Sequence, residues 1–256
     1  MDKPRVVVVT GAGSGIGRAT TLRFAREGFI VIACGRRAAP LQETAEIAAE
    51  LSGEVIAHVA DAGVQADAGR VTMAAVAAGE YFALVNNAGV GWNYGIDHPG
   101  AMSALRDTSP EQWREVMRIN LDSVYFMCHS ALQHMHAGAS IVNVASGGGL
   151  RGMDDAHTYA TAKAGMVNLT RSLARAYGPE GIRSNVIAPG FVDTEMVSSV
   201  LASAQNPFAD ETLRFQVSPL GRPGRPEEIA DAIYFMAVDA TYCNGAVLSI
   251  DGGSLA

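Results

Sequence analysis

The sequence predicts a doubly wound α/β fold, in which helices pack on both faces of a parallel sheet. Three observations predict it. Short apolar runs alternate with amphipathic stretches along the whole chain. These runs are rich in Val and Ile and mostly continuous, which is typical of strands buried on both faces. The 256 residues contain no repeat, linker or low-complexity tract, so a single domain over residues 1–256 is expected.

The apolar runs give the expected strands, and the amphipathic stretches between them give the expected helices. The strands are Arg5–Thr10, Phe29–Cys34, Glu54–Val59, Phe82–Asn86, Ser140–Ala145, Arg183–Ala188 and Ala246–Ile250. The helices are Gly15–Gly28, Ala39–Leu51, Ala66–Ala78, Pro110–Ala137, Ala156–Gly178 and Pro226–Ala237.

One long stretch between the last two expected helices has no regular pattern. It holds Pro207, Pro219 and Pro223 before the helix that starts at Pro226. Folds of this class bind ligands at the carboxyl edge of the sheet, where such a segment could close over the site. We therefore expect a substrate lid at 191–225; a plain surface excursion is the alternative.

The composition excludes several classes of function. Lys and Arg number 19 against 26 Asp and Glu, so the net charge is −7, which argues against a nucleic-acid-binding protein. No apolar run approaches the roughly 18 residues that span a bilayer, and the N-terminus lacks the pattern of a signal peptide. Cys34, Cys128 and Cys243 are too few and odd in number for a disulfide framework. They indicate reduced, buried thiols of a cytoplasmic protein.

No metal site is expected. His134 and His136 are two residues apart in an expected helix, so their side chains do not face each other.

The first expected strand ends in a glycine-rich turn, Thr10-Gly11-Ala12-Gly13-Ser14-Gly15-Ile16-Gly17, and a helix follows. Glycines allow a tight turn and a close approach of the backbone to a pyrophosphate. The helix N-terminus offers free N–H groups and a positive dipole end to the phosphates. The spacing is T-G-x-x-x-G-x-G and not the strict G-x-G-x-x-G fingerprint. In this strand–turn–helix setting it predicts a dinucleotide site.

The second expected strand ends without the acid that binds the ribose hydroxyls in many dinucleotide folds. The sequence there is Cys34-Gly35-Arg36-Arg37. Guanidinium groups suit a 2′-phosphate, so Arg36 and Arg37 favour NADP(H) over NAD(H). Ser14 adds no positive charge from the glycine turn, and the two arginines could instead only solubilise a helix start.

Tyr159 and Lys163 are four residues apart in an expected helix and so share a face. An ammonium beside a phenol stabilises the phenolate and lowers the pKa of the tyrosine. A free tyrosine titrates near 10, so work at neutral pH needs a shift of about three units, or about 4 kcal/mol. Such a phenol could exchange a proton with a carbonyl or alcohol oxygen. An ordinary pair on a helix surface is the alternative.

Ser146 ends an expected strand thirteen positions before Tyr159, and Gly147-Gly148-Gly149 follows it. A hydroxyl at the carboxyl edge of the strand points into the ligand crevice and could bind a substrate oxygen.

Together these motifs resemble the short-chain dehydrogenase/reductase family over essentially the whole chain. The matching elements are the Thr10–Gly17 turn, Asn86-Asn87-Ala88-Gly89, Asn120, Ser146, the Tyr159/Lys163 pair and Pro189-Gly190. The resemblance implies one Rossmann-type domain with a seven-stranded parallel sheet.

The resemblance also implies catalytic roles. Tyr159 would be the general acid/base, and Lys163 would lower its pKa and bind the nicotinamide ribose. Ser146 would orient the substrate oxygen, and Asn120 would hold a water in a proton relay with the lysine.

A cofactor site follows from the same resemblance. Asp61 would contact the adenine, and Asn86 would brace the sheet rather than touch the cofactor. Pro189, Gly190 and Thr194 would hold the nicotinamide carboxamide. The full expected set is Gly11, Ser14, Gly15, Ile16, Gly17, Arg36, Arg37, Asp61, Asn87, Ala88, Gly89, Tyr159, Lys163, Pro189, Gly190 and Thr194.

Three functions remain open at this point. The leading one is an NADP(H)-dependent oxidoreductase for a small or medium secondary alcohol or ketone. A 3-oxoacyl-(acyl-carrier-protein) reductase is the second, for which Arg171 and Arg175 share a helix face that could meet an acidic carrier. A catalytically inactive nucleotide-binding protein is the third. Relatives of this kind assemble as tetramers or dimers, so a homo-oligomer is expected.

The substrate itself is not readable from the sequence. The pocket would be shaped by Gly91–Ser109 and the irregular stretch. Trp92, Phe191 and Met196 could line it or serve only for packing.

Overall fold

The computed structural model describes residues 3–203 and 206–256, and these form a seven-stranded, all-parallel sheet. The strand order is β3-β2-β1-β4-β5-β6-β7, so the chain starts in the middle and winds to both edges. The strands are β1 (Arg5–Thr10), β2 (Ile30–Gly35), β3 (Glu54–Val59), β4 (Glu80–Asn86), β5 (Ser140–Val144), β6 (Arg183–Pro189) and β7 (Val247–Ile250). The predicted doubly wound α/β fold is confirmed.

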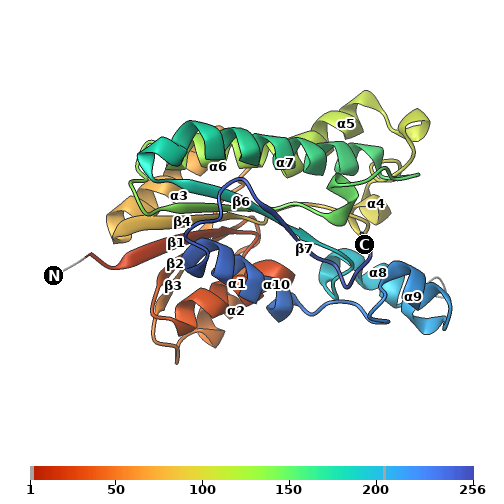
Figure 1. Ribbon diagram of the computed structural model, residues 1–256, viewed down its shortest axis with the longest axis horizontal. Coiled ribbons are helices and arrows are strands. Elements are labelled where there is room, and N and C mark those ends of the chain that lie inside the picture. The colour runs from red at the N-terminus through yellow and green to blue at the C-terminus, as the bar shows by residue number, and fades with distance from the viewer. Residues whose placement is uncertain (1–2, 204–205) are drawn as a thin grey trace.

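Helices cover both faces of the sheet (Figure 1). The α-helices are α1 (Gly15–Arg26), α2 (Ala38–Ile47), α3 (Gln65–Ala78), α4 (Tyr94–Asp97), α5 (Pro110–Met117), α6 (Ser123–Ala131), α7 (His157–Tyr177), α8 (Ser198–Leu201), α9 (Leu213–Val217) and α10 (Pro226–Tyr234). Single 3₁₀ turns are η1 (Leu105–Asp107), η3 (Gly147–Gly149), η4 (Gly178–Glu180), η5 (Glu195–Val197) and η6 (Pro207–Ala209), and π-helical turns are η2 (Arg118–Asp122) and η7 (Phe235–Asp239).

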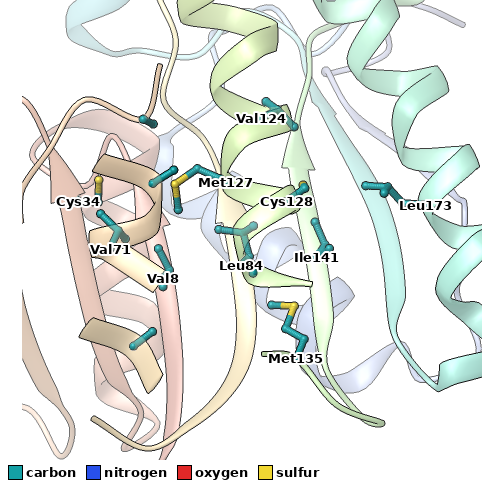
Figure 2. Packing of buried hydrophobic residues seen from close by; sticks show 14 of the residues in the cluster. Val8, Cys34, Val71, Leu84, Val124, Met127, Cys128, Met135, Ile141 and Leu173 are labelled. Carbon is teal, nitrogen blue, oxygen red and sulfur yellow. The ribbon is translucent and has the colours of Figure 1, made fainter. Parts of the chain in front are cut away.

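The core consists of two apolar layers, one on each side of the sheet. Successive strand residues point to opposite faces. In β1, Val6 and Val8 therefore pack under α3, α6 and α7, whereas Val7 and Val9 pack against α1, α2 and α10. Figure 2 shows the first layer, where Leu84 and Ile141 of the sheet lie near helix residues such as Met127. This double burial explains why the central strands are continuous apolar runs.

The two edge strands differ from that expectation. β3 is only partly buried, and Val59 at its end is 54% exposed. β7 is also partly exposed along its length. An edge strand has a neighbour on one side only, so its apolar sequence does not ensure burial on both faces.

The expected helix Pro110–Ala137 is wrong as a continuous element. α5 begins at a capping box formed by Ser109 and Gln112, and the π-helical turn η2 then separates α5 from α6. α6 ends at Ala131. The inserted turn places Asn120 inside the fold, where it is fully buried.

The segment 191–225 contains short helices that the sequence pattern did not predict: η5, α8, η6 and α9. A parallel bridge between Val192 and Gly224 ties its two ends together, so the segment leaves and re-enters the fold at one place. Within this expected lid, residues 204 and 205 lie outside the described residues.

Two further expectations concern the cysteines and the membrane. Cys34 and Cys128 are buried free thiols as predicted, whereas Cys243 is only partly buried. Within residues 3–203 and 206–256, no helix is long and apolar enough to span a bilayer.

Candidate active site

Two adjoining cavities lie at the carboxyl ends of the strands. The first, the glycine-turn cavity, has a volume of about 240 Å³ and lies over β1, β2, β3 and β4. The second, the tyrosine pocket, has a volume of about 190 Å³ and lies over β5 and β6. They share Ile16, Asn87, Thr194 and Met196, so they form one continuous cleft.

Nearly all the residues expected at the site line one of these cavities. In the glycine-turn cavity they are Gly11, Ser14, Gly15, Ile16, Arg36, Arg37, Asp61, Asn87, Ala88, Gly89 and Thr194. In the tyrosine pocket they are Ile16, Asn87, Ser146, Tyr159, Lys163, Pro189, Gly190 and Thr194. Gly17 and Asn120 line neither cavity.

The glycine turn is held in place by the neighbouring strand β4. Thr10 Oγ1 accepts hydrogen bonds from the backbone N–H groups of Asn87 and Ala88, both at 3.0 Å. Gly11 and Gly15 have φ angles of +69° and +51°, in the left-handed region that favours glycine. Ser14 is the N-cap of α1 but makes no side-chain capping bond there. The first N–H groups of α1 therefore face the cavity, in an arrangement that suits a phosphate.

Gly17 has a packing role instead of lining the cavity. A Cβ at this position would lie 2.0 Å from the carbonyl oxygen of Gly11. Only glycine allows α1 to start this close to the turn.

The two arginines after β2 are in different electrostatic situations. Arg36 lines the glycine-turn cavity and makes no ion pair with any described residue. Arg37 forms an ion pair of 3.0 Å with Glu195, a residue of the segment 191–225. Arg37 also holds the pKa of the Glu195 carboxyl below its usual range, with a smaller effect from Ser14. The second arginine is therefore not free in this structure.

Asp61 lines the same cavity but is already partly satisfied. Its Oδ1 accepts a hydrogen bond from the Gly63 N–H at 2.9 Å, and its Oδ2 lies 3.2 Å from Arg118 Nη1. These contacts fix the carboxylate at the end of β3.

Tyr159 and Lys163 lie one turn apart on α7, and both are almost fully buried. Lys163 Nζ donates a hydrogen bond to the Val144 carbonyl at 2.9 Å and lies 5.7 Å from the centre of the Tyr159 ring. Burial lowers the pKa of Lys163 to about 8. The lysine is thus held at the end of β5 in an environment that penalises its charge.

The pKa of Tyr159 is shifted in the direction opposite to the sequence prediction. Burial raises it, and a hydrogen bond with the Ser146 side chain opposes that rise. Desolvation outweighs stabilisation of the phenolate here because water is excluded from the ring while Lys163 points to a backbone carbonyl. The neutral phenol is the favoured form.

Ser146 and Asn120 complete this cluster from two other elements. Ser146 Oγ accepts a hydrogen bond from the Gly148 N–H at 3.1 Å. Asn120 Nδ2 donates to the Val116 carbonyl, and its Oδ1 accepts from the Val90 N–H, both at 3.1 Å. A Cβ on Gly89 would lie 2.7 Å from Asn120 Oδ1 and 3.5 Å from Lys163 Nζ. The asparagine and the lysine therefore approach the same glycine, although Asn120 lies behind the cavity wall.

Asn86 lies below the site, where it links the central strands. Its Nδ2 donates to Asn143 Oδ1 at 2.8 Å, and Asn143 Nδ2 donates to Thr170 Oγ1 at 2.8 Å. The predicted bracing role fits this buried chain of hydrogen bonds.

The walls of the tyrosine pocket come mainly from loops. Trp92 packs against Tyr159 with 5.5 Å between ring centres, and Phe191 and Met196 also line the pocket. Sequence reasoning missed several lining residues outside the expected lid, among them Arg151, Met153, Ser254 and Leu255. Arg151 follows the glycine run after Ser146, which is a signal that could have been used. The last two residues have no such signal, because only the fold brings the C-terminus here.

In the glycine-turn cavity, sequence reasoning missed Glu195 and several residues that complete the wall. The latter are Cys34, Gly35, Pro40, Leu41, Ala60, Ala62, Gly63, Ile119 and Ser123. Among the residues that the structure describes, no group of three or more His, Cys, Asp or Glu could hold a metal ion.

Comparison with known proteins agrees with this geometry. A family profile described as Enoyl-(Acyl carrier protein) reductase matches residues 11–254. The chain belongs to the short-chain dehydrogenase/reductase family. It is 38% identical to cis-4-hydroxycyclohexanecarboxylate dehydrogenase of Sinomonas cyclohexanicum, over 97% of this chain and 96% of the relative.

Two other relatives are informative. The chain is 35% identical to a 3-oxoacyl-[acyl-carrier-protein] reductase of Thermotoga maritima, over 97% of each chain. A crystal structure of a putative 2-deoxy-D-gluconate 3-dehydrogenase from Agrobacterium tumefaciens with bound NADP superposes with a TM-score of 0.85 at 31% identity, over 98% of this chain and 96% of the other. The protein is therefore an NAD(P)-type oxidoreductase of alcohols and ketones, as its short-chain dehydrogenase relatives are.

Proposed function

We propose that the protein transfers hydride between NADP(H) and a small secondary alcohol or ketone, with Tyr159 as the general acid/base. The observation that carries this proposal is the buried cluster in the tyrosine pocket. There the Ser146 side chain is hydrogen-bonded to Tyr159, and Lys163 lies one helical turn away. The pocket opens directly into the glycine-turn cavity.

The glycine-turn cavity fits a dinucleotide. The N-terminus of α1 offers N–H groups that Ser14 does not cap, and Arg36 forms no ion pair with a described residue. Glycines at positions 11, 15 and 17 keep the turn free of side chains. When bound here, the nicotinamide cofactor supplies or accepts the hydride.

Each residue of the cluster then has a defined task. In reduction, Tyr159 donates its phenolic proton to the carbonyl oxygen of the substrate; in oxidation it accepts the hydroxyl proton. Ser146 donates a hydrogen bond that orients the same oxygen. Lys163 binds the nicotinamide ribose, and its ammonium works with Asn120 and a water to return a proton to the phenol. The raised pKa of Tyr159 keeps the phenol protonated at neutral pH, which is the form that acts as the acid in reduction.

The preference for NADP(H) rests on Arg36 and Arg37. Arg36 is available to bind a 2′-phosphate. Arg37 must first break its ion pair with Glu195 before it can bind that phosphate. The exposed Arg37–Glu195 pair contributes little stability, so this exchange costs little. The NADP bound to the Agrobacterium relative supports the preference.

The segment 191–225 is proposed to be the substrate lid. Its residues Phe191, Met196 and Val217 line the tyrosine pocket. The bridge between Val192 and Gly224 gives it a narrow base about which it could close.

Reduction of a 3-oxoacyl carrier thioester is the second candidate. It is favoured by the Thermotoga relative and by the exposed Arg171 and Arg175 on α7, which make no ion pair within the described residues. The net charge of −7 disfavours an acidic carrier protein.

The test is to follow nicotinamide absorbance with NADPH and NADH separately, against cyclic ketones, linear ketones, 4-oxocyclohexanecarboxylate and a 3-oxoacyl carrier thioester. We expect turnover of a small ketone with a preference for NADPH. Turnover confined to the thioester would replace the first proposal with the second. Bound NADPH without turnover of any compound would favour an inactive nucleotide-binding protein.

We also propose that the protein is a cytoplasmic homo-oligomer, a tetramer or a dimer, as expected for the family. Light scattering at micromolar concentration tests the assembly; a monomeric mass would contradict it.

A further inference from the structure

We propose that the substrate carries a carboxylate, which Arg151 binds at the end of the tyrosine pocket remote from Tyr159. This inference rests on the proposed function and names the substrate class: a compact, apolar oxo or hydroxy acid.

The charge of the tyrosine pocket carries the first step. Among its described lining residues, Arg151 and Lys163 are the cationic side chains, and Asp and Glu are absent. Lys163 is buried, and its ammonium donates to the Val144 carbonyl. It is therefore held next to Tyr159 and is not free to bind another part of the substrate. Arg151 is therefore the cation available to another part of the substrate.

The situation of Arg151 differs from that of most arginines around the cleft. Arg18, Arg37 and Arg118 each form an ion pair with a carboxylate at 3.2 Å or less. Arg151 forms none with a described residue, although Asp154 and Asp155 follow it closely in the sequence. In a chain with a net charge of −7, an unpaired arginine in a cavity without acids is suited to an anionic ligand.

The position of Arg151 in the chain sets the length of the substrate. The 3₁₀ turn η3 separates it from Ser146, which contacts Tyr159. Such a turn advances about 2 Å per residue, so η3 alone separates the backbones of the two residues by about 6 Å. The carboxylate and the reacting carbonyl should therefore be several bonds apart. This spacing favours such a substrate over a 2-oxo acid, in which the two groups are adjacent.

The pocket that contains these two ends is largely apolar. Trp92, Met153, Phe191 and Met196 are among its lining residues, and its volume is about 190 Å³. Side chains of this kind favour an aliphatic or alicyclic frame over a sugar. Guanidinium binds carboxylate through two parallel hydrogen bonds, which would fix the orientation of the frame as well as its affinity.

A structural role is the alternative for Arg151. A neighbouring shallow cavity is lined by Arg151, Ser254, Leu255 and Ala256. If Arg151 served only to support the segment 254–256, its loss would affect charged and neutral substrates equally.

The kinetic test compares 4-oxocyclohexanecarboxylate with 4-oxocyclohexanecarboxamide, which has the same shape and no charge. For the wild-type protein we expect kcat/KM to be at least tenfold higher for the acid. Arg151→Met should bring this ratio close to one, and Arg151→Lys should restore part of it. Arg26→Met is the control: Arg26 is exposed on α1, lines neither cavity and should leave the ratio at its wild-type value. A wild-type ratio near one, or an equal loss for both compounds in Arg151→Met, would overturn the inference.

A binding measurement separates this inference from the proposed function. Cyclohexanecarboxylate cannot be reduced at a ring carbonyl, so calorimetric titration in the presence of NADP⁺ does not depend on turnover. We expect binding to the wild-type protein at least tenfold tighter than to Arg151→Met, and weaker binding at high salt because the arginine is exposed. Binding lost in Arg151→Met with no turnover of any ketone would uphold the acid site and reject the proposed reaction. Equal binding to both proteins would reject the acid site.

Discussion

The glycine-turn cavity and the tyrosine pocket adjoin each other but are built differently. The first is formed by the ends of four neighbouring strands and the start of α1, and hydrogen bonds from backbone N–H groups to the Thr10 side chain link β1 to the segment after β4. The second has one rigid wall, which carries Ser146, Tyr159 and Lys163. Its other walls are loops and short helical turns from three distant parts of the chain.

This difference shows how cofactor and substrate recognition are separated in the fold. The dinucleotide site depends on the strand–turn–helix geometry, which the sheet fixes. The substrate site depends on segments that can change in length and side chain without disturbing the sheet. Substitutions in the two cavities should therefore have different consequences.

The largest expected effect is that of Tyr159→Phe, which removes the proton donor and leaves the ring. We expect turnover to fall by about 10²- to 10⁴-fold, the usual contribution of general acid–base catalysis. The Kd of NADPH, measured by fluorescence titration, should stay within about threefold of the wild type. Near-wild-type turnover would refute the role of Tyr159.

Gly17→Ala tests the rigid cavity. The new Cβ would lie 2.0 Å from the Gly11 carbonyl oxygen, and a backbone atom cannot move aside as a flexible side chain can. We expect the free energy of unfolding to fall by about 3 kcal/mol or more, with loss of NADPH binding.

Gly69→Ala is the matched control for that substitution. Gly69 lies within α3, and a Cβ there would have no heavy atom within 4 Å. Alanine should stabilise this helix by up to about 1 kcal/mol. Denaturant unfolding of both variants measures the contrast; similar values for the two would mean that the turn tolerates a side chain.

The pH dependence of the two reaction directions probes the tyrosine pocket. Reduction uses the protonated phenol, which predominates below the pKa of Tyr159, whereas oxidation uses the phenolate. Because burial raises that pKa, oxidation should accelerate by up to about tenfold per pH unit above neutrality, and reduction should not. The measurement is the initial rate in each direction between about pH 6 and about pH 10. Parallel profiles would show that another group controls the proton.

The smallest effects concern the choice between the two cofactors. Arg36→Ala should weaken NADPH binding by about tenfold and leave NADH binding nearly unaffected, because a single charge-assisted hydrogen bond is lost. Glu195→Gln removes the competing partner of Arg37 and should strengthen NADPH binding by a few fold. Titration of both variants with both cofactors checks this. If Glu195→Gln weakened NADPH binding, the ion pair would be supporting the site instead of competing for it.

Most of the fold could be predicted because local pattern and tertiary environment agree in the central strands. The run Val6–Val9 reads as a buried strand, and its alternate residues do enter the two core layers. The pattern failed at Arg118–Asp122, where a π-helical turn interrupts the expected helix. An extra residue in a helical turn shifts the apolar pattern by one position, and a pattern that covers only two turns on each side does not resolve such a shift.

The sequence by itself determined the sheet, the glycine turn and the grouping of Ser146, Tyr159 and Lys163, because each depends on residues close together in the chain or on the carboxyl ends of strands. The tertiary structure alone decided three other features. It paired Arg37 with Glu195, it placed Arg151 in the tyrosine pocket without an ion pair to any described residue, and it brought Leu255 to the same pocket. It also reversed the expected shift of the Tyr159 pKa. Burial and long-range ion pairing depend on neighbours that are distant in sequence, and a local pattern does not record them.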